Sequence, residues 1–74
     1  MYSNAQGAFN MAQVILRLPA VKARTGLSRS TIYLRVAEGA FPKSIALGPR
    51  AVGWIEAEIA DWIAQRIAQS RKAA

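Results

Sequence analysis

A helix, a glycine turn and a second helix follow one another within about twenty residues, and this segment constrains the fold most. Pro19 favours the first turn of a helix, because its missing N–H would have no partner there, and this helix is expected to run to about Arg24. Gly26 follows, and glycine adopts the left-handed conformation that ends a helix sharply. Ser28 is a good N-cap for a second helix running to about Glu38. This order of elements is typical of a helix-turn-helix motif.

A β-hairpin and a third helix are predicted after the two-helix unit. Ser44–Leu47 and Ala51–Ile55 are expected strands, because Gly48-Pro49-Arg50 between them is a turn sequence. Glu56–Gln69 is expected to form an amphipathic helix with acids in its first turns, as the helix dipole favours. Its apolar stripe comprises Ile55, Ile59, Trp62, Ile63 and Ile67. The predicted fold class is therefore mainly α with a small β-hairpin, a winged helix-turn-helix.

The length of the chain, 74 residues, allows one domain. We assign the winged helix-turn-helix domain to residues 13–70, beginning with the short β-prone run Ile15–Leu18. Residues 1–12 are small and polar without any period, so a flexible N-terminal tail is expected there. Residues 71–74 are expected to form a short basic C-terminal tail.

Cysteine and histidine are absent from the chain, which removes the usual ligands of zinc and the usual nucleophile–base pairs. The four carboxylates form no recognisable acid–base pair. We therefore expect no metal, no cofactor, no small-molecule ligand and no enzymatic activity. No apolar run approaches the roughly 20 residues of a membrane span, and no secretory signal pattern is present. A soluble, cytoplasmic, nucleoid-associated protein without a membrane partner is expected.

Positive charge is concentrated on the two-helix unit and the hairpin. The chain carries ten Lys and Arg against four Asp and Glu, a formal net charge of +6. The basic residues of the central segment are Lys22, Arg24, Arg29, Arg35, Lys43 and Arg50, and Glu38 is its single acid. A surface that served only solubility would not need this segregation. The charge pattern therefore favours double-stranded DNA as the partner.

The outward face of the second helix carries side chains that are predicted to contact DNA. Arg29 suits a bidentate contact with guanine, while Ser30 and Thr31 suit phosphate or base edges. Tyr33 suits a phosphate contact, or else lies half-packed on the neighbouring helix. Arg35 suits either a phosphate contact or a surface salt bridge. The N-terminal part of this helix is the predicted reading surface.

Cations on the hairpin and its flank extend the predicted DNA surface. Arg50 at the hairpin tip suits insertion into the minor groove, where the potential is most negative, or else is a solvated loop residue. Lys43 at the base of the hairpin suits a phosphate contact, and Arg24 is a further flanking candidate.

Apolar residues of the same segments are predicted to form the core rather than the site. Ile32 and Val36 lie one helical turn apart and are expected to pack with Leu27. Trp54 is expected to pack under the second helix rather than stack on a base. Trp62 belongs to the apolar stripe of the last helix and is expected in the core.

Residues 18–67 resemble the AlpA family of prophage regulatory proteins, which are relatives of excisionase and MerR-type winged helix-turn-helix proteins. The motifs that carry the resemblance are TGLSRSTIY, FPKSIALGPRAVGW and DWI. The resemblance implies a second helix in the major groove with the wing beside it. It also implies transcriptional activation of integrase or excision genes, or a directionality factor that bends the attachment site for integrase. The contacts it implies are Ser28, Arg29, Ser30, Thr31 and Tyr33 in the helix, and Arg50 with Lys43 in the wing.

The order Leu34 then Arg35 departs from the family, which often has a basic residue directly after the tyrosine. Leu34 is therefore a candidate protomer contact, and with the last helix it suggests self-association along DNA. A small protein-interaction module, such as an integrase adaptor or an anti-repressor, is the alternative function. A membrane-surface peptide, suggested by the basic C-terminal end, is disfavoured by the acids of the same helix.

Overall fold

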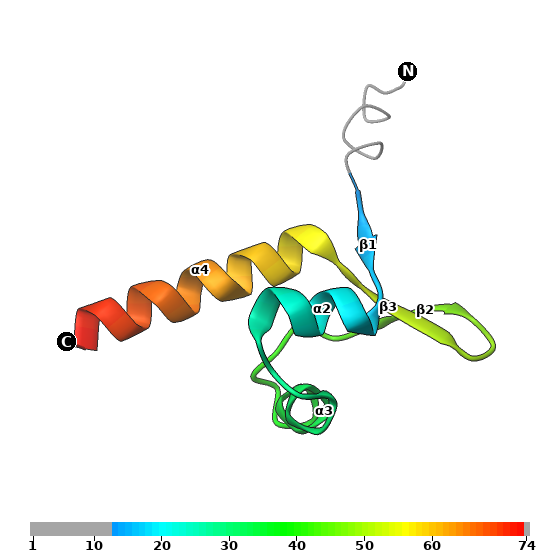
Figure 1. The fold of residues 1–74 in the computed structure, drawn as a ribbon, viewed down its shortest axis with the longest axis horizontal. Coiled ribbons are helices and arrows are strands. Elements are labelled where there is room, and N and C mark those ends of the chain that lie inside the picture. The colour runs from blue at the N-terminus through cyan, green and yellow to red at the C-terminus, as the bar shows by residue number, and fades with distance from the viewer. Residues whose placement is uncertain (1–12, 74) are drawn as a thin grey trace, which may run out of the picture.

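The computed structural model describes residues 13–73, so the predicted tail at residues 1–12 lies outside the described part of the chain. The elements are β1 (Ile15–Leu16), α2 (Leu18–Thr25), α3 (Arg29–Ala37), β2 (Ile45–Gly48), β3 (Ala51–Ile55) and α4 (Glu56–Ala73). In Figure 1, the β2–β3 hairpin and α4 extend in opposite directions from α2 and α3. Three helices and a small antiparallel sheet confirm the predicted fold class. No helix within the described range has the length and hydropathy needed to cross a membrane.

The turn between α2 and α3 is built by local hydrogen bonds. Gly26 has φ of 74°, and its N–H donates to Lys22 O at 2.8 Å, which ends α2. The Thr25 hydroxyl donates to Val21 O at 2.8 Å and accepts from Leu27 N at 3.2 Å. Because glycine meets no Cβ penalty at positive φ, the chain reverses here without strain. The predicted helix-turn-helix unit is confirmed.

The sheet has three strands in the order β1-β3-β2, one more than the hairpin that the sequence predicts. β1 pairs antiparallel with β3, with Ile15 opposite Ile55 and Leu16 opposite Trp54. The hairpin itself is confirmed, although β2 begins one residue later than predicted and ends at Gly48. A third strand forms because the β-prone run before α2 finds an unpaired edge on β3.

The core lies where α2, α3 and the first turns of α4 meet β3. Its buried residues are Leu16, Val21, Ile32, Phe41, Trp54 and Ile59, and Leu27 and Val36 pack partly buried against them. Trp54 is 0% exposed, and its indole N–H donates to Pro42 O at 3.0 Å. The predicted core positions of Ile32, Val36 and Leu27, and the place of Trp54 under α3, are confirmed.

Helix α4 continues to Ala73, beyond its predicted end at Gln69, so residues 71–73 are helical rather than a tail. The extension follows from the sequence, since no glycine or proline interrupts it and Arg71 and Lys72 suit the C-terminal end of the dipole. Ile67 is 47% exposed, so its expected place on the buried stripe is wrong. The reason is that the second half of α4 projects past the other elements (Figure 1). Trp62 is half-buried, and its indole N–H donates to Ala40 O at 2.8 Å.

Gly53, in the middle of β3, lacks a side chain, and this allows residues of β1 and β2 to pack closely against β3 on both sides. A Cβ at this position would overlap with Ile15 Cγ2 and lie 3.1 Å from both Leu16 O and Leu47 Cδ1. Gly53→Ala is therefore expected to destabilise the domain by about 1–3 kcal/mol, because overpacking forces neighbours off their rotamers. Urea denaturation followed by circular dichroism measures the loss. Ile15→Ala in the same chain should restore part of the stability, and an unchanged unfolding midpoint in Gly53→Ala would contradict the prediction.

Candidate nucleic-acid interface

The first turn of α3 is closed by its N-cap, Ser28. The Ser28 hydroxyl accepts from Thr31 N at 3.2 Å and donates to Thr31 Oγ1 at 2.9 Å, and Ser30 Oγ lies 3.3 Å from Ser28 Oγ. Because the Ser28 hydroxyl already donates and accepts hydrogen bonds in capping the helix, it has little remaining capacity to bind a ligand. Thr31 accepts from Ser28, so its own hydroxyl hydrogen is free to donate to an external acceptor.

The exposed face of α3 follows from helical spacing. Ile32 is fully buried, whereas Ser30, Leu34 and Ala37 are exposed and Thr31 is half-buried. Residues three and four apart in a helix lie on one side, so these four positions form one continuous surface. This surface points away from the core and contains two hydroxyl groups at its N-terminal end. The structure therefore brings predicted contacts Ser30 and Thr31 together.

Arg29 belongs to a stack of side chains on the side of α3 that faces β3. Its guanidinium carbon lies 5.4 Å from the centroid of the Tyr33 ring. The Tyr33 ring meets the Trp54 ring edge-on, with centroids 6.2 Å apart and an interplanar angle of 60°. Trp54 is itself held by the hydrogen bond to Pro42 O. The contact favours the position of the Arg29 side chain over the Tyr33 ring before any ligand binds, by about 0.5–1 kcal/mol at an exposed site.

Tyr33 and Arg35 flank the exposed face on either side. Tyr33 is 39% exposed, and its ring packs edge-on against Trp54 of β3, so it is half-packed and still presents part of its surface to a ligand. Arg35 is half-buried, and its Nε is buried with no hydrogen-bond partner among the described residues. The described residues also give Arg35 no salt bridge.

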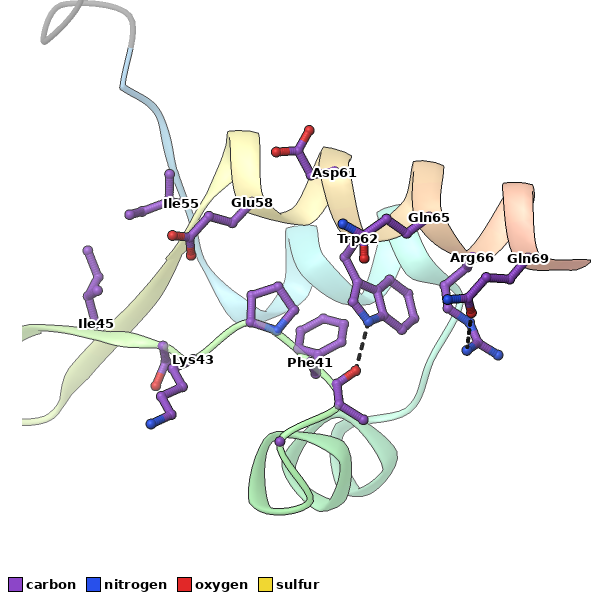
Figure 2. Close-up of a pocket in the computed structure, with 14 residues that line it drawn as sticks. Phe41, Lys43, Ile45, Ile55, Glu58, Asp61, Trp62, Gln65, Arg66 and Gln69 are labelled. Carbon is purple, nitrogen blue, oxygen red and sulfur yellow. Dashed lines mark hydrogen bonds between the residues drawn. The ribbon is translucent and has the colours of Figure 1, made fainter.

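The hairpin presents Arg50 at its tip. Pro49 and Arg50 form the turn between β2 and β3, and Arg50 is exposed. Lys43 is also exposed, and in Figure 2 its side chain extends away from α4, toward the side of the molecule where α3 lies. Lys43 therefore adds positive charge on the side of the molecule where α3 lies, whereas Arg50 lies at the tip of the hairpin, which extends away from the helices (Figure 1).

Arg24 has a partner inside the protein. Its guanidinium Nη1 lies 2.8 Å from Glu56 Oε2, so this ion pair links α2 to the first turn of α4. The pair is partly exposed and contributes little to stability. A phosphate contact by Arg24 would require this pair to open or to share its guanidinium, which makes Arg24 a weaker candidate than Arg29 or Arg50.

Arg17 is a cation that the sequence reasoning missed. It precedes α2, and its Nε donates to Val52 O of β3 at 3.0 Å. The bond satisfies a carbonyl on the edge of β3 just beyond the end of β1, and it brings a guanidinium beside the hairpin. Arg17 lies outside the basic segment that begins at Lys22, so only the pairing of β1 with β3 reveals its position.

A capped helix that follows a glycine turn and lies beside a β-hairpin defines a winged helix-turn-helix protein. The family model for the Prophage CP4-57 regulatory protein (AlpA) matches residues 14–67. The chain belongs to the AlpA family of prophage regulatory proteins. This confirms the resemblance that the motifs indicate, and the family is one of regulators rather than of enzymes.

Two similar proteins come from an enteric bacterium and from a phage. The DNA-binding transcriptional activator AlpA of Escherichia coli (strain K12) is 50% identical over 58 aligned positions, which cover 70% of this chain and 83% of that protein. An uncharacterized protein, ORF88, of Enterobacteria phage P4 is 44% identical over 57 positions, which cover 77% of this chain and 65% of that protein. The region shared with the family model contains α2, α3 and the hairpin in full.

Proposed function

We propose that the chain is a sequence-specific DNA-binding regulator of a prophage or integrative mobile element. In this proposal α3 enters the major groove with Arg29, Ser30, Thr31 and Tyr33 toward base edges and phosphates. The hairpin lies beside it, with Arg50 at the minor groove. The observation that carries the proposal is the exposed N-terminal half of α3, which is capped by Ser28 and carries Arg29 against the Tyr33 ring. The activity of the relative AlpA, a DNA-binding transcriptional activator, supports it.

Fluorescence anisotropy with labelled duplexes tests the DNA proposal. One duplex spans the promoter and attachment region of the protein's own element, and a scrambled duplex of equal length is the control. Tighter binding to the native duplex, with affinity that falls steeply as salt rises, is the expected result, because phosphate contacts release counterions. Equal and weak binding to both duplexes would contradict the proposal. It would show only non-specific attraction between a basic protein and DNA.

Arg50→Ala is expected to weaken binding to native and scrambled duplexes by a similar factor. Because the substitution removes one cation from the phosphates or the groove, it should also lower the slope of log affinity against log salt by about 1. The exposed tip position means that the fold should be unaffected. Arg71→Ala, at the far end of α4, is the matched control for the loss of one positive charge. A change in Arg50→Ala no larger than in this control would remove Arg50 from the interface.

The proposed role includes excision of the element as well as regulation of transcription. A recombination directionality factor binds the attachment site, whereas an activator binds the promoter of the integrase or excision genes, and one complex can serve both. Assays of excision with the element's integrase, and of transcription from its promoter, distinguish the two outputs. Loss of both outputs in Arg29→Ala would support one shared DNA complex. Excision that is unchanged without this protein would remove the directionality role.

Contacts with integrase or with a second copy on DNA are proposed through α4. An open groove lies between α4, from Glu58 to Gln69, and the loop before β2, and Phe41 and Trp62 lie in it (Figure 2). Because Glu58 and Asp61 line this groove together with Lys43 and Arg66, its charges are mixed, and a protein partner is favoured there over DNA. Analytical ultracentrifugation with a duplex of several sites tests self-association. Strictly independent loading of one molecule at a time would count against it.

A further inference from the structure

Leu34 is the most exposed of the large apolar side chains in the described part of the chain, at 58%. It lies on α3, one turn after Ser30 and three residues after Thr31, so it shares the exposed face with their hydroxyl groups. Ile32 and Val36, on the other side of the helix, supply the contacts with the core. Leu34 therefore contributes to neither the core nor the turn, and the fold does not explain its apolar character.

The surroundings of Leu34 are unlike a protein–protein contact. Its neighbours on the exposed face are Ser30, Thr31 and Ala37 of the helix and the C-cap Glu38, and Tyr33 at the flank is the other large exposed hydrophobic side chain of α3. Stable protein interfaces bury on the order of 800 Å² on each partner around a cluster of apolar anchors. One leucine beside polar side chains, an acid and the partly exposed Tyr33 ring does not supply such a cluster. A second copy of the chain is thus a poor match for this surface.

The major groove of DNA offers an apolar group of the right size, the 5-methyl of thymine. Apolar side chains that lie in the major groove contact this methyl. We propose that Leu34 contacts a thymine methyl in the major groove and thereby specifies an A·T pair in the bound site. This inference rests on the proposed function and deepens it, because it names the chemical group that one position of α3 recognises.

The Leu34 position follows the first-turn contacts along the helix. The rise of an α-helix is 1.5 Å per residue, so Leu34 lies about 6 Å further along the axis than Ser30. Successive base pairs are about 3.4 Å apart. The thymine is therefore expected about one or two base pairs from the base that the first turn reads, and within the same half of the footprint as the Arg29 contact.

A thymine-to-deoxyuridine scan tests the proposal. Each thymine in the protected part of the native duplex is replaced singly by deoxyuridine, which removes only the methyl group, and the affinity is measured by anisotropy. One replacement is expected to weaken binding of the wild-type chain about four-fold, the loss that burial of one methyl predicts. The same replacement should leave the affinity of Leu34→Ala unchanged. Leu34→Met, which keeps an apolar side chain, should stay sensitive.

The control variant is Ile67→Ala, which truncates another exposed apolar side chain on the projecting half of α4. It should keep the full deoxyuridine effect. Binding that no replacement weakens, or equal losses in wild type and Leu34→Ala, would overturn the assignment of Leu34 while leaving specific DNA binding intact. A Leu34→Ala variant that loses only cooperative loading on a multi-site duplex would also overturn it, in favour of a protomer contact. Failure of the wild-type chain to prefer the native duplex would instead defeat the proposed function.

Discussion

Trp54→Ala is expected to remove about 3–5 kcal/mol from the free energy of unfolding, a large part of the total stability of the domain. The side chain is fully buried at the centre of the core, where it supports α3 through the Tyr33 ring. Truncating a buried aromatic side chain to alanine costs about 3–5 kcal/mol. The whole stability of a domain of this length is on the order of 4–11 kcal/mol, at roughly 0.05–0.15 kcal/mol per residue. The substitution also leaves Pro42 O without its donor.

Thermal and urea unfolding, followed by far-ultraviolet circular dichroism, measure this loss. Trp54→Phe is the informative partner variant, because it keeps an aromatic ring and removes the indole N–H that binds Pro42 O. Trp62→Ala is the matched control, since Trp62 is only half-buried. The expected order of stability is wild type, then Trp54→Phe, then Trp54→Ala, with Trp62→Ala above Trp54→Ala. A Trp54→Ala midpoint close to that of the wild type would contradict the packing of α3 on β3.

The parts of the fold that the sequence predicts correctly are local. Gly26 and Ser28 specify the end of one helix and the start of the next by backbone conformation and by one side-chain hydrogen bond. The turn at Pro49 and Arg50 similarly specifies the hairpin, because proline and glycine there exclude a continuous strand. Such signals act within a few residues, so they can be recognised without knowledge of the tertiary structure.

The parts that the sequence did not predict depend on contacts between distant residues. The pairing of β1 with β3 joins positions about forty apart, and it also sets Arg17 against Val52 O. The ion pair between Arg24 and Glu56 is equally non-local. It makes Arg24, a predicted DNA contact, less available to a phosphate. The apolar period of α4 continues through Ile67, although the packing partners end before it. The periodicity of the sequence shows which face of a helix is apolar. It does not show over what length of the helix other elements pack against that face.

Side-chain direction within the candidate site also needed the structure. The order of Leu34 and Arg35 left open which of them faces outward. The structure shows Leu34 exposed and Arg35 half-buried with its Nε against the protein. The difference follows from the position of Ile32, whose burial sets the rotation of α3 about its axis.

Arg29→Ala is expected to weaken binding to the native duplex by about 5- to 150-fold, which corresponds to the roughly 1–3 kcal/mol of a bidentate guanine contact. The loss on a scrambled duplex should be much smaller, because phosphate attraction does not depend on sequence. Discrimination at one base pair should therefore relax. Anisotropy against duplexes substituted at each position of the footprint measures both effects, and the unfolding midpoint confirms that the exposed substitution leaves the fold intact.

Arg29→Lys separates the geometry of the contact from its charge. Lysine keeps the positive charge but cannot donate two parallel hydrogen bonds to guanine O6 and N7, so it should restore non-specific affinity without restoring discrimination. Tyr33→Phe keeps the ring over which the Arg29 guanidinium lies and removes only the hydroxyl, whereas Tyr33→Leu removes both, so a larger loss in Tyr33→Leu than in Tyr33→Phe measures how far the ring orders Arg29. Equal losses on native and scrambled duplexes in Arg29→Ala would show a phosphate contact instead. Base recognition would then rest on the hydroxyl groups of Ser30 and Thr31.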